Sequence, residues 1–480
     1  MEDDKNKIAS NTLVQIVGRI FVLALSLVSI KLITNYLGPS GTGYYNTVIT
    51  YLSFFIVIAD FGLFTVAVRE IAKFPEKRRR ILANTFSIRL WSSIIVTILA
   101  IFIAGFTNYP NEIKRGVMIA ALFPIFNLTG SIYDVLFQVK LQMQKVVIAE
   151  AISKIFAIVG VYLAVIYNLG FYAIIATVSL AALINFLTKL LVSKKELPFK
   201  LEHNKEMIID IIKMSAPFGI VFIVNNIYFK IDTLILFYYK GAVDVGIYAV
   251  AYRVLETTLF AGSYLSSSLK PLLSVSIRED KEKVRGTLSQ AITFLLFMSL
   301  AIAVICFTFS KEIILLLSNS EFVIGKNALI ILGFVGIFIY ISGLFGEIMI
   351  AMDKRATLLK TSLFILVFNI GLNIYLIPKY SFIGAAYSTL VSEIILTIIG
   401  FVVTKKLIEI KFDLSRIFKL IFISFVASIF GFLMKQLGLS FIANLFIVTI
   451  IYCFFAYFSD AIPKRIINEY LLSLKLKWLK

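Results

Sequence analysis

The sequence predicts an all-α membrane protein that crosses the bilayer about fourteen times, and its composition is the first reason. Hydrophobic residues make up 60% of the 480 positions and charged residues 16%, whereas soluble domains contain roughly 45–50% and 25%. A chain this apolar cannot cover its surface with polar groups in water. Its single histidine, His203, lies alone in a Lys/Glu-rich loop, and Cys306 and Cys453 lie in apolar runs. We therefore expect no disulfide framework, no metal site and no cofactor.

The second reason is a series of apolar runs of membrane-crossing length. A helix that crosses roughly 30 Å of hydrocarbon needs about 20 apolar residues. Fourteen runs are expected to be such helices, and the thirteenth is short enough to leave a twelve-span count open. These spans are 12–33, 47–68, 86–106, 117–137, 147–167, 170–188, 215–237, 246–269, 288–309, 328–351, 357–377, 382–404, 420–434 and 439–459.

The third observation is the placement of the basic residues, because the chain carries a net charge of +19. Lys and Arg concentrate at the termini and in the loops between even-numbered and following odd-numbered spans. Such loops stay in the cytoplasm, so we expect a multi-pass protein of the cell (plasma or inner) membrane with both termini cytoplasmic. The charge is then topological, and nucleic acid is not an expected partner. The basic run 76–80 is interpreted as an anchor, or alternatively as a contact for anionic lipids.

An internal repeat divides the predicted spans into two halves. Gly43-Tyr44-Tyr45 recurs as Gly246-Ile247-Tyr248, and a later pair of segments at 171–173 and 383–385 keeps the same order. Six spans separate the copies, so the halves share one orientation and form two pseudo-symmetric six-helix bundles. In transporters such halves hold the substrate between them, although duplication for packing alone is the other interpretation. We expect a bundle at 1–190, a cytoplasmic linker at 191–214, a bundle at 215–404, and a helix pair with a basic cytoplasmic tail at 405–480.

Charged residues inside the spans indicate where a substrate would bind, because a charge at the bilayer centre costs about 2.5–3.5 kcal/mol. The deep ones concentrate on spans 1, 2, 7 and 8, which are equivalent pairs in the repeat. The candidates for substrate binding are basic or amide side chains on these spans: Arg19, Lys230, Arg253, Gln15 and Asn226. The candidates for ion or proton coupling are the acids Asp60, Glu256 and Asp232.

Two alternatives accompany this interpretation of the intramembrane charges. The first is internal ion pairing, of Arg253 with Glu256 or of Lys230 with Asp232 or Asp60. The second concerns the shallow charges, which extend to the interface without a functional role. We expect this of Arg89, Asp134 and Glu150, near the cytoplasmic ends of their spans, and of Lys31 near an outer end.

Missing motifs narrow the class of membrane protein. Gly325-Lys326 is followed by Asn327, so no phosphate-binding loop of an ATP-driven pump is present. No loop is suited to a channel filter, and none is large enough for the active site of a membrane glycosyltransferase. We therefore expect no catalytic residues and no enzyme, and a secondary transporter with two rocking halves remains.

Several motifs resemble those of the Wzx-type polysaccharide flippases, a family of the multidrug/oligosaccharidyl-lipid/polysaccharide (MOP) exporter superfamily. Each motif is loose, but their order along residues 8–410 is fairly specific. They are LGPSGTGYY at 37–45, ADFGL at 59–63, SAP at 215–217, IDTL at 231–234, VGIYAVAYR at 245–253, and NIGLNIYLIPKYSFIGAAYSTLVSE at 369–393.

This resemblance implies a fold like that of the multidrug and toxin exporters (MATE) and the lipid II flippase, with spans 1, 2, 7 and 8 lining a cavity in a V-shaped pair of bundles. It implies alternating access that moves a polyprenyl-diphosphate-linked oligosaccharide from the cytoplasmic to the outer leaflet. In the related lipid II flippase, cavity arginines are thought to hold the diphosphate. By helix and depth, Arg19 and Arg253 are the residues of this chain most similar to those arginines, and Lys230 is a weaker match. Spans 13 and 14 resemble the extra pair of helices that forms a lipid-tail groove in that relative.

Two other functions remain open at this stage. A proton- or sodium-coupled multidrug antiporter of the MATE type would use the intramembrane acids, but the basic residues Arg19 and Arg253 do not favour a cationic drug. A scaffold for polysaccharide-synthesis enzymes is the other alternative, and it leaves the intramembrane charges unexplained. Such enzymes are also conceivable partners of a flippase.

Overall fold

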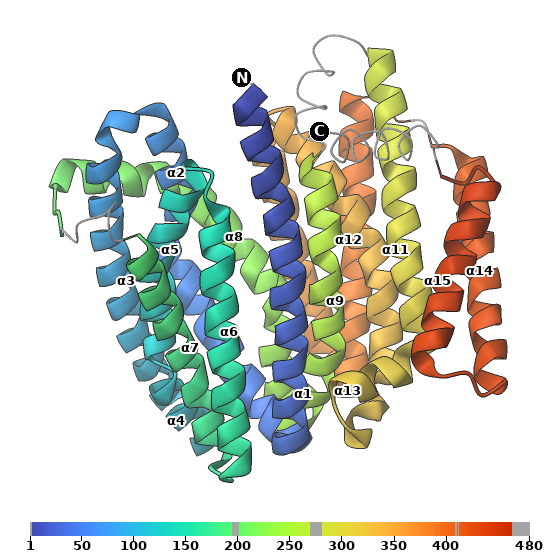
Figure 1. The fold of residues 1–480 in the computed structure, drawn as a ribbon, viewed down its shortest axis with the longest axis horizontal. Coiled ribbons are helices and arrows are strands. Elements are labelled where there is room, and N and C mark those ends of the chain that lie inside the picture. Colours follow the sequence, from blue (N-terminus) through green and yellow to red (C-terminus); the bar gives the residue numbers. More distant parts are fainter. Residues whose placement is uncertain (1, 194–200, 269–280, 409, 411, 463–480) are drawn as a thin grey trace. The chain divides into compact units, whose positions relative to one another are not determined.

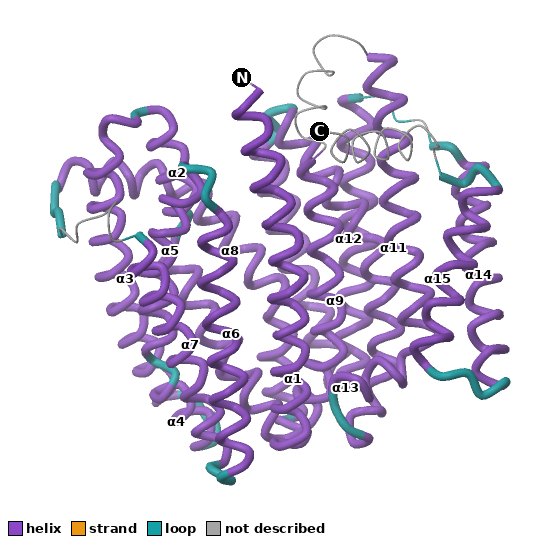
Figure 2. Tube along the Cα trace, viewed as in Figure 1, coloured by secondary structure: helices purple, strands orange, loops and turns teal. Residues whose placement is uncertain are grey.

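The computed structural model describes residues 2–193, 201–268, 281–408, 410 and 412–462 (Figure 1). Within these residues the regular elements are all helices, joined by short loops, and no strand occurs (Figure 2). The expected all-α architecture is therefore confirmed. Contacts divide the chain into two units, the first comprising Met1–Ala249 with Leu317–Glu321 and the second Val250–Leu316 with Phe322–Lys480. The predicted boundary at 191–214 stays a prediction.

The helices of the first unit follow one another with few intervening residues. They are α1 (Glu2–Asp60), α2 (Leu63–Lys73), the 3₁₀ helix η1 (Pro75–Lys77), α3 (Arg78–Phe106), α4 (Asn111–Ile119), α5 (Leu122–Val139), α6 (Met143–Ile166), α7 (Gly170–Val192), α8 (Lys205–Lys240) and the beginning of α9 (Ala242–Ser268). The second unit contains the rest of α9, then α11 (Lys281–Leu317), part of the 3₁₀ helix η2 (Ser320–Gly325), α12 (Lys326–Ala351), α13 (Arg355–Leu407), α14 (Leu414–Gln436) and α15 (Phe441–Phe458).

Eleven helical segments of the described chain are long and apolar enough to cross a membrane. Two of them, of 57 and 53 residues, would each be about 80 Å long at 1.5 Å per residue, which suffices for two crossings. Both are broken, at Gly38 with φ 62° and at Ser381 with φ 53°. Glycine adopts a positive φ without steric cost, and Pro39 directly follows. The structure thus shows tight breaks where loops were expected, and the count of fourteen spans stays a prediction.

The repeated glycines mark a reciprocal contact between α1 and the beginning of α9. A side-chain carbon at Gly43 would lie 1.8 Å from the carbonyl oxygen of Ala242, and one at Gly246 would lie 2.0 Å from that of Pro39. Both distances are far below van der Waals contact, so only glycine fits at either position. Pro39 and Ala242 are related by the same sequence offset as Gly43 and Gly246. The repeat therefore relates the two halves of this contact to each other, as expected when two copies of a duplicated element pack together.

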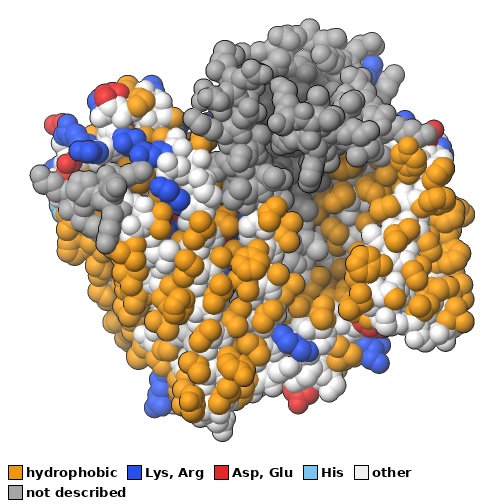
Figure 3. All heavy atoms as spheres, in the orientation of Figure 1, with side chains coloured by type: hydrophobic (Ala, Val, Ile, Leu, Met, Phe, Trp, Pro, Cys, Tyr) orange, Lys and Arg blue, Asp and Glu red, His pale blue; other side chains and the backbone are white. Residues whose placement is uncertain are grey.

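Each unit has an apolar core that fixes the polar side chains described below. In the first unit, α2 turns its apolar face inward and packs with α3, α5 and α6 around Ile71, Leu136 and Phe137. In the second unit, α14 and α15 pack against α11 around Phe309 and Tyr452. Hydrophobic side chains also cover most of the described surface on the face shown in Figure 3, where Lys and Arg lie mostly toward the upper and lower parts. Such an outer surface suits lipid rather than water.

Side chains donate hydrogen bonds to backbone carbonyls at two irregular points of α11, its end and its kink. At the end of α11, Thr34 Oγ1 donates to the Leu317 carbonyl at 2.9 Å, and Lys31 Nζ donates to that of Ser318. Lys31 therefore bonds the backbone just after α11, and its expected extension to the outer interface stays a prediction. Within α11, Phe309 leaves the helical conformation, and Lys435 of α14 bonds both the Thr308 carbonyl and Glu312. A cation inserted beside the helix ladder accounts for this kink.

Candidate functional site

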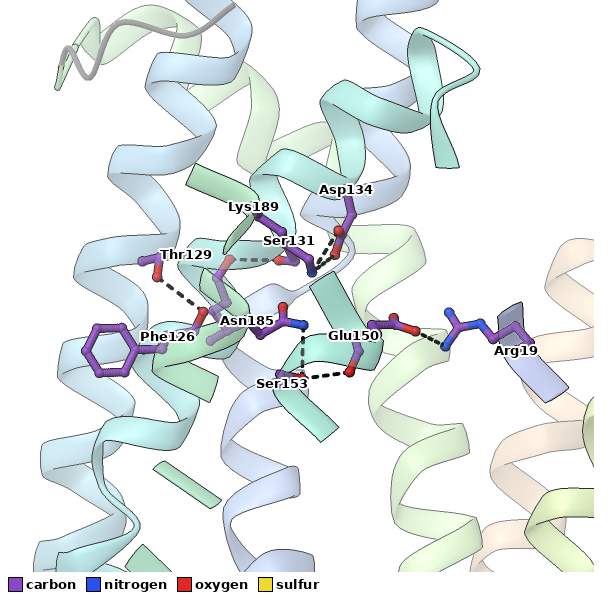
Figure 4. A network of polar contacts seen from close by, with 10 residues as sticks. Arg19, Phe126, Thr129, Ser131, Asp134, Glu150, Ser153, Asn185 and Lys189 are labelled. Atoms are coloured by element: carbon purple, nitrogen blue, oxygen red, sulfur yellow. Dashed lines mark hydrogen bonds and ion pairs between the residues drawn. The ribbon is translucent and has the colours of Figure 1, made fainter. Parts of the chain in front are cut away.

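The first candidate, Arg19 on α1, forms an ion pair with Glu150 on α6 (Figure 4). Arg19 Nη1 lies 2.8 Å from Glu150 Oε2, and 42% of the arginine side chain and 22% of the glutamate side chain are accessible. This is a one-point contact between one nitrogen and one oxygen, so most of the guanidinium fork is left available. The neighbouring candidate Gln15 belongs to α1, but its side chain lies outside the described part of the structure.

Around this pair, α5, α6 and α7 contribute further polar contacts (Figure 4). Ser153 Oγ donates to the Glu150 carbonyl at 2.9 Å, and Asn185 Nδ2 reaches Ser153 Oγ at 3.5 Å. Lys189 Nζ lies 2.8 Å from Asp134 Oδ1 and 2.9 Å from Oδ2, and the Lys189 side chain is only 6% accessible. Lys189 sat just beyond the predicted end of its span, so sequence reasoning missed it.

A second enclosed pair joins Asp60, at the end of α1, to Arg89 of α3. Arg89 Nη2 donates to Asp60 Oδ1, and the Arg89 side chain is 0% accessible. The expected extension of Arg89 to the interface is therefore wrong, because its side chain is fully buried. For Asp134 and Glu150 it stays a prediction, although each has an oppositely charged partner on another helix. The Asp60 carboxylate thus bonds Arg89, and the alternative that it pairs with Lys230 stays a prediction.

The candidates on α8 lie in a more enclosed environment. Asp232 is 3% accessible and accepts hydrogen bonds from Tyr248 Oη at 2.6 Å and from the Thr233 backbone at 2.7 Å. Tyr248 is the tyrosine of the repeated motif, so the motif also serves to satisfy a buried acid. Asn226 and Lys230 are half-buried one turn apart, and no described residue hydrogen-bonds the buried Asn226 Oδ1.

The candidate arginine of the second unit repeats the geometry of Arg19. Arg253 Nη1 lies 2.9 Å from Glu256 Oε2, one turn further along α9, and the two side chains are 41% and 35% accessible. The pairing expected from their spacing is confirmed. The structure thus assigns Arg19, Asp60, Asn226, Lys230 and Asp232 to the first unit, and Arg253 and Glu256 to the second.

The second unit also carries an apolar groove between α11, α12 and α14. Its volume is about 440 Å³, and apart from two serines its lining is hydrophobic. Phe307 of α11, Phe334 of α12 and Phe425 of α14 are among the side chains that border it. A groove of this kind matches a hydrocarbon chain and offers nothing to a charged ligand.

Family models and relatives agree with this arrangement. Residues 8–276 match the model of a family described as polysaccharide biosynthesis protein, and residues 217–375 match the MatE family. The probable low-salt glycan biosynthesis flippase Agl15 of Haloferax volcanii is 23% identical over 416 residues, which cover 85% of this chain and 86% of Agl15.

Solved structures share the fold. The inward closed conformation of the lipid II flippase MurJ superposes with a TM-score of 0.77 at 16% identity, covering 94% of this chain and 99% of MurJ. An inward-facing multidrug resistance MATE transporter of the MOP superfamily superposes with a TM-score of 0.64 at 15% identity, covering 81% of this chain and 95% of the transporter. The expected MOP-type fold is confirmed.

Proposed function

The chain belongs to the polysaccharide biosynthesis protein family, since that model matches residues 8–276 of its 480, and we propose that it is a flippase for lipid-linked oligosaccharides. The observation that carries the proposal is the state of two arginines in helices that the sequence predicts to cross the membrane. Arg19 and Arg253 are 42% and 41% accessible, and in the described part of the structure each bonds a single carboxylate oxygen. A charge kept partly open in such a helix marks a substrate path.

The cargo that suits these arginines is a polyprenyl-diphosphate-linked oligosaccharide. Guanidinium forks bind phosphate oxygens in pairs, and the Lys230 ammonium and the Asn226 and Gln15 amides would add single contacts to the head group. An oligosaccharide that crossed hydrocarbon unaided would lose the water bound to its many hydroxyls, and each dehydrated hydroxyl would cost several kcal/mol. A polar route that opens alternately to the two leaflets removes that cost, so the transfer needs no covalent chemistry.

The apolar groove of the second unit provides a place for the polyprenyl tail. Its lining by α11, α12 and α14 is almost entirely hydrophobic, so the tail would stay in a lipid-like environment while the head group moves. The groove thus supports the expectation that the C-terminal helix pair takes part in tail binding.

Location and orientation complete the proposal. A cell-membrane location with both termini cytoplasmic follows from the distribution of Lys and Arg. Lys77, Arg79 and Arg80 are exposed at the junction of η1 and α3, where they suit anionic lipid head groups. Polysaccharide-synthesis enzymes would be the functional partners, because they make the cargo and consume it.

The runner-up is a proton- or sodium-coupled multidrug antiporter, favoured by the MatE match at residues 217–375. Asp60, Asp232 and Glu256 would then be the coupling acids, and they are also the candidates if a flippase is driven by ion exchange. Asp60 and Glu256 are neutralised by arginine partners, which makes them poor sites for a cationic drug.

The test is reconstitution in liposomes that contain a fluorescent polyprenyl-diphosphate oligosaccharide, with its arrival on the opposite face as the measurement. We expect flipping by the wild type, its loss in Arg19→Ala and Arg253→Ala, and its retention in the control Arg115→Ala, which removes an exposed arginine on α4. No flipping by the wild type, together with ion-driven efflux of a cationic dye that Asp60→Asn abolishes, would support the antiporter instead.

A further inference from the structure

The carboxylate of Glu150 has a role in cargo binding that its position in the sequence does not suggest. We propose that Glu150 is a built-in substitute for the cargo's phosphate: it holds Arg19 in the empty protein and is displaced when a diphosphate binds. Glu150 is thus a positioning residue that sets the affinity of Arg19 for cargo. This inference rests on the proposed function, because it takes a phosphorylated lipid as the ligand of Arg19.

The geometry of the pair is that of a replaceable ligand. Among the described residues the Arg19 guanidinium bonds only Glu150, through one nitrogen and one oxygen 2.8 Å apart. A phosphate group that approaches the open edge of the fork would make two parallel bonds, where the carboxylate makes one. The incoming phosphate can therefore begin to bind at the open edge of Arg19 while Glu150 is still bound. It then replaces the carboxylate because it makes two bonds where the carboxylate makes one.

Comparison with the other intramembrane pairs of this unit shows that an open geometry is not general. Arg89 is 0% accessible beside Asp60, and Lys189 is 6% accessible beside Asp134. Neither cation offers an edge to an incoming ligand. In the second unit, however, Glu256 holds Arg253 through one nitrogen and one oxygen as well. The open form therefore accompanies both candidate cargo arginines, although different helices supply the two carboxylates.

The surroundings of Glu150 allow its carboxylate to leave Arg19 without becoming an isolated charge. Its turn of α6 is held by Ser153, whose hydroxyl bonds the Glu150 carbonyl. Besides Arg19, the cations that interact electrostatically with Glu150 are Lys189 of α7 and Lys154 of α6. Lys154 lies one turn further along the same helix, at a spacing that places two side chains side by side. The displaced carboxylate can thus turn from Arg19 toward Lys154 and return once the cargo has left.

Removing the competitor should strengthen cargo binding and slow its release. In Glu150→Gln the side chain keeps its size but loses the charge that competes for Arg19. For a partly accessible pair, we expect the dissociation constant of a diphosphate ligand to fall about fivefold to tenfold. The maximal flipping rate should fall at the same time, because nothing then helps to displace the cargo from Arg19. A purely structural pair would show the reverse, with weaker binding.

The experiment titrates the purified full chain in nanodiscs with farnesyl diphosphate and measures maximal flipping in liposomes. The matched control is the double variant Asp134→Asn with Lys189→Met, which removes a membrane acid and its partner together. We expect tighter binding and slower flipping in Glu150→Gln, no change of affinity in the control, and no gain when Glu150→Gln is combined with Arg19→Ala. If Glu150→Gln is too unstable to titrate, Glu150→Asp, with its shorter reach, should also bind more tightly than the wild type.

The outcomes separate this inference from the proposed function. Binding of farnesyl diphosphate by the wild type that Glu150→Gln leaves unchanged or weakens would overturn the role of Glu150 alone. A gain of affinity that persists without Arg19 would do the same. Absence of farnesyl diphosphate binding in the wild type, in Glu150→Gln and in Glu150→Asp would overturn the proposal of a phosphorylated cargo and, with it, this inference.

Discussion

Two kinds of ion pair lie within the described helices, and they differ in how much of the cation they leave accessible. Arg89 with Asp60 and Lys189 with Asp134 are enclosed, with cations 0% and 6% accessible, whereas Arg19 with Glu150 and Arg253 with Glu256 leave 42% and 41% of the arginine open. We call these the enclosed and the open pairs. An enclosed pair supports the fold, because removing one partner strands a charge. An open pair retains capacity for another ligand.

The largest effect is expected from breaking an enclosed pair on one side only. Asp134→Ala leaves Lys189 without its partner inside the helices, and a stranded buried charge costs about 3–5 kcal/mol in the free energy of unfolding. Replacing both residues, as Asp134→Asn with Lys189→Met, should recover most of that loss. Unfolding of the purified protein in denaturant measures both variants. A single variant as stable as the wild type would remove the distinction between the two kinds of pair.

A pair of intermediate accessibility should give an intermediate effect. Lys435 and Glu312 are 26% and 28% accessible, and Lys435 also bonds the Thr308 carbonyl at the kink of α11. Lys435→Met should lower the free energy of unfolding by about 1.5–3 kcal/mol, the usual worth of hydrogen bonds to a charged group. Thermal unfolding of the variant provides the measurement, and a cost equal to that of Asp134→Ala would contradict a scale based on accessibility.

The open pair should contribute little to stability. For Arg19→Ala we expect a loss of about 0–1 kcal/mol, the usual worth of an accessible ion pair, because Lys154 still interacts with the remaining Glu150 carboxylate. Flipping should nevertheless be lost, since the fork that binds the diphosphate is gone. Parallel measurements of unfolding and flipping on one preparation separate the two effects. A large loss of stability with flipping intact would reverse the assignment.

The smallest change is the replacement of an open arginine by lysine. Arg19→Lys keeps the charge and its attraction to Glu150 but replaces a planar fork with a point charge. Stability should stay within about 0.5 kcal/mol of the wild type, while flipping slows because the bidentate contact is lost. Equal flipping rates for the two proteins would show that charge alone, without the fork, serves the cargo.

Local relations were predictable from the sequence, and distant ones were not. The spacing of Arg253 and Glu256 on one helix predicted their pair, and the repeated glycines at 43 and 246 predicted equivalent elements, which the structure shows in direct contact. Arg19 and Glu150 are 131 positions apart, and no periodicity relates them. Glu150 was therefore left out of the candidate site, although it touches the best candidate arginine.

Depth along a helix was also a poor guide to accessibility. Arg89 lies near the start of the predicted span 86–106, yet α3 begins at Arg78 and the Arg89 side chain is 0% accessible beside Asp60 of α1. The break at Ser381, by contrast, lies in the predicted loop between the spans 357–377 and 382–404, close to Pro378. The burial of Arg89 depends on which helices pack together, which the hydrophobic pattern of a single helix does not encode.

The most direct test of the two kinds of pair measures flipping of the fluorescent lipid-linked oligosaccharide at equal amounts of folded protein. It compares Arg253→Ala, which breaks an open pair, with the double variant Asp134→Asn and Lys189→Met, which removes both charges of an enclosed pair. We predict that Arg253→Ala loses flipping while the double variant flips at close to the wild-type rate. Flipping retained by Arg253→Ala and lost by the double variant would contradict the assignment of cargo binding to the open pairs.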